Sequence, residues 1–230
     1  MILTNRRFER EAPVREAKSI YIFCEGAKRE YQYFDYFKEM DSRINVEVYK
    51  LAPHEDNSPL GLLSIAKNCI ISSSENPKPK YTFQENDEVW IVLDTDKDKS
   101  ESRDPQIKTV IKEITEFDNW TLTQSNPCFE VWLYYHLHKE KPDFEENEYC
   151  TNWKRIVNDS IKGGFDSRRH PIYIESATKN AETNFKLENA KPNIGSTEVF
   201  KLSKSILPLI KVKLQKVLNE LEEKKIKTKA

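Results

Sequence analysis

Residues 87–96, Asp87-Glu-Val-Trp-Ile-Val-Leu-Asp-Thr-Asp96, join an apolar run directly to two aspartates. A short apolar run that is rich in β-branched residues and bounded by polar ones predicts a buried strand. The stretch Ser19-Ile-Tyr-Ile-Phe-Cys-Glu-Gly26 has the same form, and it ends in a glutamate and a glycine. We therefore expect two buried strands that each lead into an acidic residue.

Elements of alternating type surround these two strands. We expect two more strands at 44–51 and 120–124, and helices at 28–40, 60–72 and 105–117. Strand and helix thus alternate four times, which is typical of parallel strands connected by helices. The sequence predicts an α/β fold with a mostly parallel four-stranded sheet flanked by helices.

The second part of the chain is predicted to be helical. Asn126-Pro127 has the form of a helix start, with an N-cap residue and a proline at the first helical position. Further helices are expected at 153–161, at 176–187 and from Ser196 onward. The last of these carries an apolar stripe, and Pro208 is expected to kink it. We divide the chain into an α/β domain at 1–140 and a helical extension at 141–230, which packs on that domain or on a partner.

Composition excludes several classes of protein. The 37 lysines and arginines balance 38 aspartates and glutamates. The chain is therefore not a polycation that coats nucleic acid, but this charge balance does not exclude a local basic groove. No apolar run approaches the ~20 residues that cross a bilayer, and the charged N-terminus has no apolar signal segment. The four cysteines are scattered without a C-x-x-C pair, which argues against a disulfide scaffold and a zinc finger. We expect a cytoplasmic protein without membrane contact.

Asp94 and Asp96 form a candidate metal site. Side chains two positions apart in an extended segment project to the same side, and carboxylate oxygens suit Mg²⁺ or Mn²⁺. Asp98 continues the alternation. An EF-hand is excluded, because Lys99 and Pro105 stand where its glycine and its final glutamate are required. A solvated acidic turn is the alternative interpretation.

The ends of the predicted strands favour the metal interpretation. In parallel α/β sheets, functional groups gather beyond the carboxyl ends of the strands. Glu25 follows the first strand, Asp94 and Asp96 follow the third, and Ser125-Asn126 follows the fourth. Lys28 and Arg29 lie in the first turn of a predicted helix, where cations oppose the helix dipole and are better explained by an anionic ligand. Two exposed basic side chains are the alternative.

These motifs resemble a known family. Glu25-Gly26 after one strand and Asp94-Thr-Asp96 after another look like the signature of Toprim domains. Three longer stretches together resemble the RloB-like proteins, namely Ile22-Phe-Cys-Glu-Gly26 with Glu30 to Phe34, Trp90-Ile-Val-Leu-Asp-Thr-Asp96, and Ser125-Asn-Pro-Cys-Phe-Glu-Val-Trp-Leu133. The last stretch is the most specific, and weaker matches extend the resemblance over most of the chain. Ala27-Lys28-Arg29 departs from the lysine and threonine that are common there.

The resemblance implies a Toprim-like domain with Mg²⁺-dependent phosphodiester chemistry. It also implies a bacterial restriction or anti-phage locus and an ATPase partner. In such a site Asp94 and Asp96 hold the divalent ion, and Glu25 completes its shell or acts as a general acid–base. Glu130 could reach the same pocket from the next helix, although an acid there also favours the helix dipole. The catalytic candidates are Glu25, Asp94, Asp96 and Glu130.

The candidate nucleic-acid contacts are Lys28, Arg29, Asn126, Arg168 and Arg169. Asn126 is expected to cap a helix first and to contact substrate second. A solvated charged loop is the more common explanation of a pair such as Arg168 and Arg169, and the departure from the family pattern leaves the role of Lys28 open. No G-x-x-x-x-G-K-[ST] motif is present, so the chain has no phosphate loop of that kind for ATP.

Two functional hypotheses follow. The first is a metal-dependent nuclease that acts on RNA, such as tRNA, or on DNA, and that a partner ATPase controls. The second is a non-catalytic subunit with the same fold, which docks on an ATPase through its terminal helix. A topoisomerase or primase is disfavoured, because the residues outside the α/β domain are too few for their other catalytic domains. Assembly into a homo-oligomer stays open.

Overall fold

A five-stranded sheet forms the centre of the protein in the computed structural model, which describes residues 8–96, 100–142, 149–189 and 191–227. The strand order is β2-β1-β3-β4-β7, with β1 to β4 parallel and β7 antiparallel to β4. The bounds are β1 Lys18–Cys24, β2 Ile44–Val48, β3 Glu88–Asp94, β4 Trp120–Asn126 and β7 Ser196–Thr197, and a separate pair consists of β5 Leu187–Glu188 and β6 Lys191–Pro192. The predicted mostly parallel sheet is confirmed, with one short antiparallel strand added.

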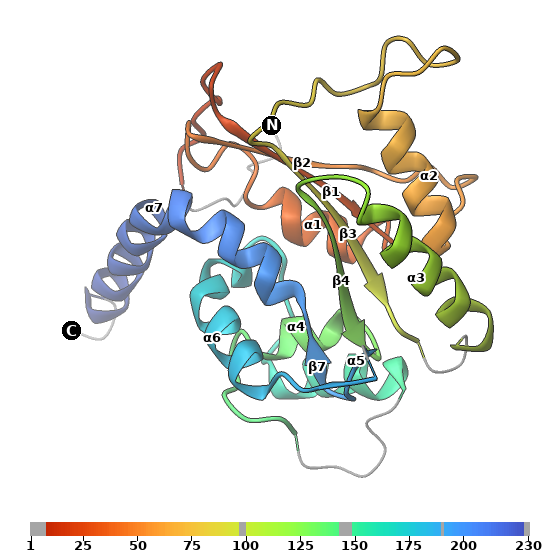
Figure 1. The fold of residues 1–230 in the computed structure, drawn as a ribbon. Helices are drawn as coiled ribbons and strands as arrows, with labels where there is room; N and C mark the ends of the chain where they lie inside the picture. The colour runs from red at the N-terminus through yellow and green to blue at the C-terminus, as the bar shows by residue number, and fades with distance from the viewer. Residues whose placement is uncertain (1–7, 97–99, 143–148, 190, 228–230) are drawn as a thin grey trace.

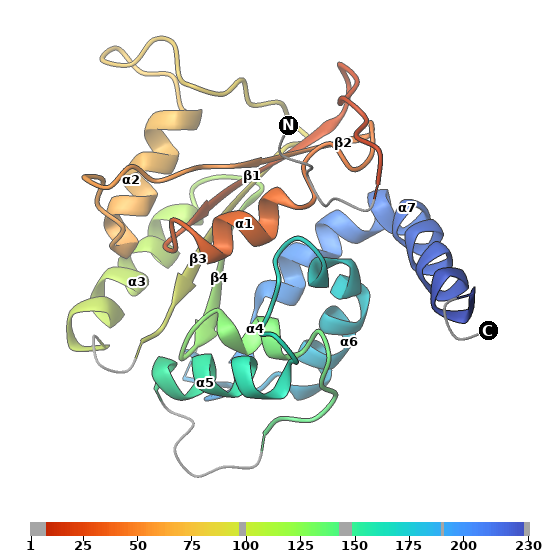
Figure 2. The same ribbon diagram turned by 180° about the vertical axis from the view of Figure 1, so that it is seen from behind.

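Helices cover both faces of this sheet (Figures 1 and 2). Their bounds are α1 Arg29–Asp35, α2 Pro59–Ile70, α3 Ser100–Ile114, α4 Glu130–Tyr134, α5 Cys150–Ser160, α6 Ile174–Asn184 and α7 Val199–Lys227. One hydrophobic cluster joins a face of the sheet to α1 and α4–α7, and a second joins the opposite face to α2 and α3. Because both faces are covered, every residue from Ile20 to Cys24 is buried.

The pairing of the central strands brings three strand ends to one edge. β3 and β4 pair through Asp94 and Ser125. The backbone N–H of Glu25 donates to the carbonyl of Val92 at 3.4 Å, and that of Thr95 donates to the carbonyl of Ser125 at 2.9 Å. Hydrogen bonding therefore continues past the strand ends, and Glu25 and Asp94 leave neighbouring strands close together.

The predicted helix start at Asn126-Pro127 is wrong. Asn126 is the last residue of β4, its peptide bond to Pro127 is cis, and α4 starts only at Glu130. The strand reaches this far because β7 pairs with it, with Ser196 opposite Asn126. A local capping pattern could not reveal a pairing strand that lies so much later in the chain.

The other predicted helices are present with shifted ends. α3 starts at Ser100, so Pro105 lies inside the helix and not at its first position. α1 ends at Asp35, and the chain continues in tight turns in which Phe37 and Met40 stay buried. The spacing of the aromatic residues, which predicted a longer helix, therefore marks the residues that are buried. The turns after α1 keep these side chains buried without continuing the helix.

The C-terminal helix packs back onto the sheet. Its apolar stripe belongs to the cluster that also contains α1 and β1, and the buried members are Val199, Leu202, Ile206, Ile210, Leu214 and Val217. Since Ile210 is 0% and Leu214 3% exposed, this stripe is not free to dock on a partner. α7 contains Pro208, and Figure 1 shows that the helix changes direction along its length. The domain division at residue 140 stays a prediction.

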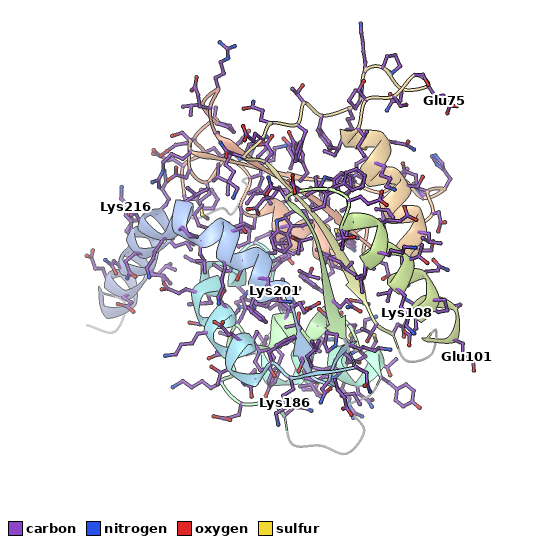
Figure 3. All side chains as sticks on the ribbon, in the orientation of Figure 1. Glu75, Glu101, Lys108, Lys186, Lys201 and Lys216 are labelled. Atoms are coloured by element: carbon purple, nitrogen blue, oxygen red, sulfur yellow. The ribbon has the colours of Figure 1, made fainter. Side chains whose placement is uncertain are left out.

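Charged side chains of both signs point outward on different sides of the molecule, as Glu75, Glu101, Lys186 and Lys216 do in Figure 3. This spread agrees with the near-zero net charge of −1. Among the helices that the structure describes, none is both long enough and apolar enough to cross a bilayer.

Candidate active site

Four carboxylates gather at the edge where the central strands end. Glu25 follows β1, Asp94 ends β3, Glu30 lies in the first turn of α1, and Glu130 starts α4. Glu130 is 4% exposed, and the other three are half-buried. These residues, named here the carboxylate cluster, come from four elements and meet only because the parallel sheet aligns its carboxyl ends.

Two members of the carboxylate cluster have raised pKa values. Burial raises the pKa of Asp94 well above its usual range, and the negative charges of Glu30 and Glu25 raise it further. Burial also raises the pKa of Glu30 to about 7, with added repulsion from Glu130 and Glu25. Like charges that are held together in a partly dry site favour protonation or a bound cation.

Glu30 is a site residue that the sequence-based candidates do not include. Its carboxylate lies directly over the backbone of Gly26. A Cβ atom at position 26 would be only 1.7 Å from Glu30 Oε2. The sequence signal for this approach is a glycine four residues before an acid. Any larger residue at 26 would exclude the carboxylate from its position.

Gly26→Ala is therefore expected to move the Glu30 carboxylate outward without unfolding the protein, because a flexible side chain can swing away. As the carboxyl enters water, its pKa should fall from about 7 towards the ordinary value of 4.5. A ¹³C NMR titration of the glutamate carboxyl carbons would measure this, with Glu30→Gln to assign the signal. An unchanged titration in Gly26→Ala would show that Glu30 does not depend on this glycine.

Arg103 is the second site residue that sequence reasoning did not find. Its Nη1 donates to Glu25 Oε1 at 2.9 Å, and its Nη2 donates to Glu25 Oε2 at 2.6 Å and to the carbonyl of Asp94 at 3.0 Å. The residue is 5% exposed. Since the predicted helix began at Pro105, Arg103 fell in an assumed loop. Its place in the first turns of α3 is what directs it at Glu25.

The candidate Arg29 also meets the carboxylate cluster. Its Nη1 donates to Glu130 Oε1 at 2.8 Å, and the Arg29 side chain is 40% exposed. This ion pair links α1 to α4 and occupies one nitrogen atom of the Arg29 guanidinium. Glu130 in turn is buried with a cationic partner, as a buried acid requires.

Three of the candidate nucleic-acid contacts line one cleft. Lys28, which caps α1, Arg29 in its first turn and Arg168 from the loop after α5 border a cavity of about 670 Å³. Asp35 and Asp166 also line this cavity. Arg168 also pairs with Asp166, with Nε to Oδ1 at 3.0 Å. Arg169 lies next to this group, and its Nε is 3.5 Å from Asp166 Oδ2. We call this the basic cleft.

Asn126 lies elsewhere. Its Nδ2 donates to the carbonyl of Pro192 at 2.6 Å, and the residue borders a separate cavity of about 640 Å³ that Lys108, Lys141 and Lys191 also line. Its expected role as a helix cap is wrong, because its side chain fastens β6 to the end of β4. The structure does not bring Asn126 to the basic cleft.

Asp96 adopts a left-handed backbone conformation, with φ 35°, and its N–H donates to the carbonyl of Pro127 at 3.0 Å. Aspartate tolerates this conformation better than most residues. Residues 97–99, and with them Asp98 and Lys99 of the acidic motif, lie outside the described residues.

The donor set suits a hard divalent cation, since it consists of carboxylate oxygens whose charges repel one another. Within the described ranges, however, no group of three or more His, Cys, Asp and Glu side chains is arranged to hold a metal ion. Both oxygens of Glu25 are bound by Arg103 instead. The chemistry of the donors therefore fits a metal ion, whereas their arrangement here is one in which arginines supply the positive charge.

The fold and the carboxylate cluster define an α/β protein with an acidic site beyond the carboxyl ends of its central strands. The family model for the RloB-like protein matches residues 20–206, and the chain belongs to that family. The resemblance inferred from the motifs is thereby confirmed. No curated protein and no solved structure matches the chain.

Proposed function

We propose that this protein is a metal-dependent nuclease that hydrolyses phosphodiester bonds in RNA, such as tRNA, or in DNA. The observation that carries the proposal is the carboxylate cluster, in which burial, and after it the repulsion between the carboxylates, raises the pKa of Asp94 and Glu30. The basic cleft beside it adds support, because its cations suit a phosphate backbone. Membership of the RloB-like family is compatible with both.

The proposed metal ligands are Asp94, Asp96 and Glu25, which would hold Mg²⁺ or Mn²⁺; when bound, the ion would neutralise the phosphate and stabilise the leaving oxygen. Asp94 and Glu25 are proposed from their position in the carboxylate cluster, and Asp96 from the motif resemblance alone. Glu30, with a pKa of about 7, suits a group that takes up or releases a proton near neutral pH. Lys28 and Arg168 would bind backbone phosphates and orient the scissile bond.

The resemblance to RloB-like proteins leads us to propose further that the enzyme acts in the bacterial cytoplasm against phages, under the control of a partner ATPase. The buried stripe of α7 is not the contact for that partner. Co-purification with a co-expressed ATPase from the same locus would test the association.

One observation favours the second candidate function, a non-catalytic interaction subunit. Arg103 and Arg29 already pair with Glu25 and Glu130, so two of the four carboxylates have a counter-charge without a metal ion. A cluster balanced in this way could serve stability alone. Direct assay separates the two functions.

The purified chain should cleave labelled tRNA, single-stranded DNA or duplex DNA with Mg²⁺ or Mn²⁺ and not with EDTA. Asp94→Asn should lower the cleavage rate by about 10²–10³-fold, because it removes one charge aimed at the reacting centre. Asp118→Asn is the matched control, since Asp118 is exposed and lies between α3 and β4.

Metal-dependent cleavage that survives in Asp94→Asn would contradict the proposed site. Absence of cleavage in the wild-type chain with each substrate, also in the presence of the ATPase, would favour the interaction subunit. Equal loss in Asp94→Asn and Asp118→Asn would indicate damage to the fold, which a thermal unfolding scan of each variant would detect.

A further inference from the structure

The cavity beside Asn126 lies on the face of the sheet that α3 covers. It has a volume of about 640 Å³, and none of the described residues that line it also lines the basic cleft. Leu122 on β4 belongs to the hydrophobic cluster of this face. Gln124 and Asn126 follow at alternate positions of the same strand, so they project to the same side. We call this the lysine cavity, and its volume is within the range of small-molecule sites, about 300–1,000 Å³.

The wall of the lysine cavity that faces α3 is fixed by hydrogen bonds. The side chain of Asn126 donates to the carbonyl of Pro192 at 2.6 Å, and the N–H of Gly195 donates to the carbonyl of Asn126 at 2.7 Å. Lys191 on β6 reaches across to α3, where its Nζ lies 3.0 Å from both oxygens of Asp104. The cavity is therefore bounded by fastened elements, and a ligand would enter a site that is already formed.

Gln124 brings an unpaired amide group to the lysine cavity. The residue is 5% exposed and lines the cavity near the end of β4. Its main chain is bound to Glu198, because its N–H donates to Glu198 Oε2 at 3.2 Å and its carbonyl accepts from the N–H of Glu198 at 2.8 Å. Its side-chain amide forms no hydrogen bond with the described residues. Buried amides normally have partners, so this one points to a ligand with a donor and an acceptor on one edge.

The lysine cavity also holds cations that lack a counter-charge. Neither Lys108 nor Lys141 forms an ion pair with the described residues, whereas Asp104 is already paired with Lys191. The other acid on the lining, Glu188, is exposed. The three lysines therefore exceed the two acids, which suits an anionic group.

The position of Lys141 is set by Gly195. A Cβ atom at position 195 would be 2.6 Å from Lys141 Cε, so the lysine stem lies directly over this glycine, whose φ is +76°. Burial, and after it the charge of Lys186, lowers the pKa of Lys141. Both effects oppose the charged form of the lysine, and a bound anion would offset them.

Apolar side chains complete the lysine cavity. Ile107 and Ile111 line it from α3, and Pro192 and Ile194 line it from the facing wall. Ile111 is 37% exposed although it is apolar. Apolar walls on either side of an amide are how proteins hold a flat nucleobase and read its edge. The walls, the amide and the lysines thus match the base and the phosphate of one nucleotide.

We propose that the lysine cavity binds a nucleotide unit, with the base between the apolar walls against Gln124 and the phosphate at Lys108 and Lys141. The same chemistry is offered by a free mononucleotide and by one nucleotide of a single strand. The inference is independent of the proposed hydrolysis, because the cavity lies on the other face of the sheet from the basic cleft and its binding groups are an amide and two ammonium ions.

Isothermal titration calorimetry of the full-length chain in EDTA tests the proposal, with AMP, GMP, CMP and UMP as separate probes. At least one of them should bind with a Kd below about 1 mM. Gln124→Leu removes the amide at similar size and should weaken that binding by about fivefold or more. Lys141→Gln should weaken it by about threefold or more, because a charge-assisted contact to phosphate is lost.

Lys216→Gln is the control with the same change of charge. Lys216 is exposed on α7, and Figure 3 shows it on the opposite side of the molecule from Lys108. It should change the Kd by less than about twofold, because exposed charges are screened. Circular dichroism would show whether each variant is folded. If Gln124→Leu does not fold, Lys108→Gln and Lys141→Gln decide the result.

A single-stranded octanucleotide separates the two sources of the ligand. If Gln124→Leu weakens binding of both the mononucleotide and the octanucleotide, the cavity accepts a unit of a strand. If it weakens binding of the mononucleotide alone, the ligand is a free nucleotide. If it weakens binding of the octanucleotide alone, the cavity requires a strand. Each of these results supports the nucleotide site.

Three results would overturn the proposal. The first is that no mononucleotide binds and that Gln124→Leu and Lys141→Gln leave octanucleotide binding unchanged. The second is that a mononucleotide binds equally well to wild type and to the folded cavity variants. The third is that inorganic phosphate binds as tightly as the nucleotide, which would exclude recognition of a base. None of these results depends on cleavage, so they leave the proposed nuclease to its own assay.

Discussion

Glu25→Ala is expected to lower the free energy of unfolding of the metal-free protein by about 3 kcal/mol, because it leaves the Arg103 guanidinium buried without its carboxylate. The side chain of Arg103 is 7% exposed, so water cannot replace the lost partner. Removing Glu25 also relieves its repulsion of Asp94 and Glu30, which acts in the opposite direction. We therefore place the effect at the low end of the range for a broken buried pair. Urea unfolding in EDTA would measure it.

The double variant Glu25→Ala/Arg103→Ala identifies the cause. If the loss comes from the stranded guanidinium, the double variant should be more stable than Glu25→Ala, with a coupling of about 1–3 kcal/mol between the two sites. Additive losses would mean that the two residues contribute separately. The cycle requires no activity, so it holds whether or not the protein proves to be a nuclease.

Acid is expected to destabilise the protein through His136. This residue is 2% exposed; its Nδ1 lies 3.0 Å from the carbonyl of Trp132 and its Nε2 3.0 Å from the hydroxyl of Tyr33. A carbonyl can only accept, so Nδ1 carries the proton, and Tyr33 donates to Nε2. Burial lowers the pKa of His136 from 6.5 to about 3. The folded protein therefore keeps this imidazole neutral.

The sign of the pH effect follows from proton binding. Between pH 6.5 and about 3 the unfolded chain binds a proton at His136 that the folded protein does not bind. The stability contribution is complete above pH 6.5 and falls by about 1.4 kcal/mol for each pH unit below it. Glu30 acts oppositely between its unfolded pKa of 4.5 and its folded pKa of about 7, since there the folded state binds the extra proton. The two effects partly cancel in the wild-type protein.

Comparison with His136→Gln isolates the histidine, because Glu30 contributes equally to both proteins. At pH 7 the variant should be less stable by about 1–3 kcal/mol, owing to unsatisfied buried groups. By pH 5 this gap should shrink by about 2 kcal/mol. Urea unfolding at pH 7, 6 and 5 would show it, with His54→Gln as the exposed control. A gap that stays constant over this range would mean that His136 titrates in the folded protein as it does in the unfolded chain.

The predictable and unpredictable parts of the site differ in their physical origin. Glu25 and Asp94 could be placed at strand ends because the apolar runs before them have to be buried, and parallel strands end at a common edge. Glu130 could be proposed from its place early in the next helix. Glu30 escaped notice because its position depends on a backbone approach at Gly26 and not on any periodic pattern.

The ion pairs between residues far apart in the sequence could not be predicted from the sequence. Arg103 meets Glu25 over a separation of 78 residues, and Arg29 meets Glu130 over 101. A lysine or arginine in a loop or first turn carries no local sign of its partner, because the choice depends on how helices pack on the sheet. For the same reason the basic residue Arg29, which suggested an anionic ligand, proved to face a carboxylate.

The amino-acid sequence alone was enough to establish a mostly parallel α/β sheet, the acids at its strand ends and the family. Each of these rests on burial of contiguous apolar residues or on local motifs. Tertiary packing decided what surrounds those acids: that β7 extends β4 past Asn126, that the stripe of α7 is covered, and that Arg103 binds Glu25. Charges act through space, so their partners emerge only when distant segments are brought together.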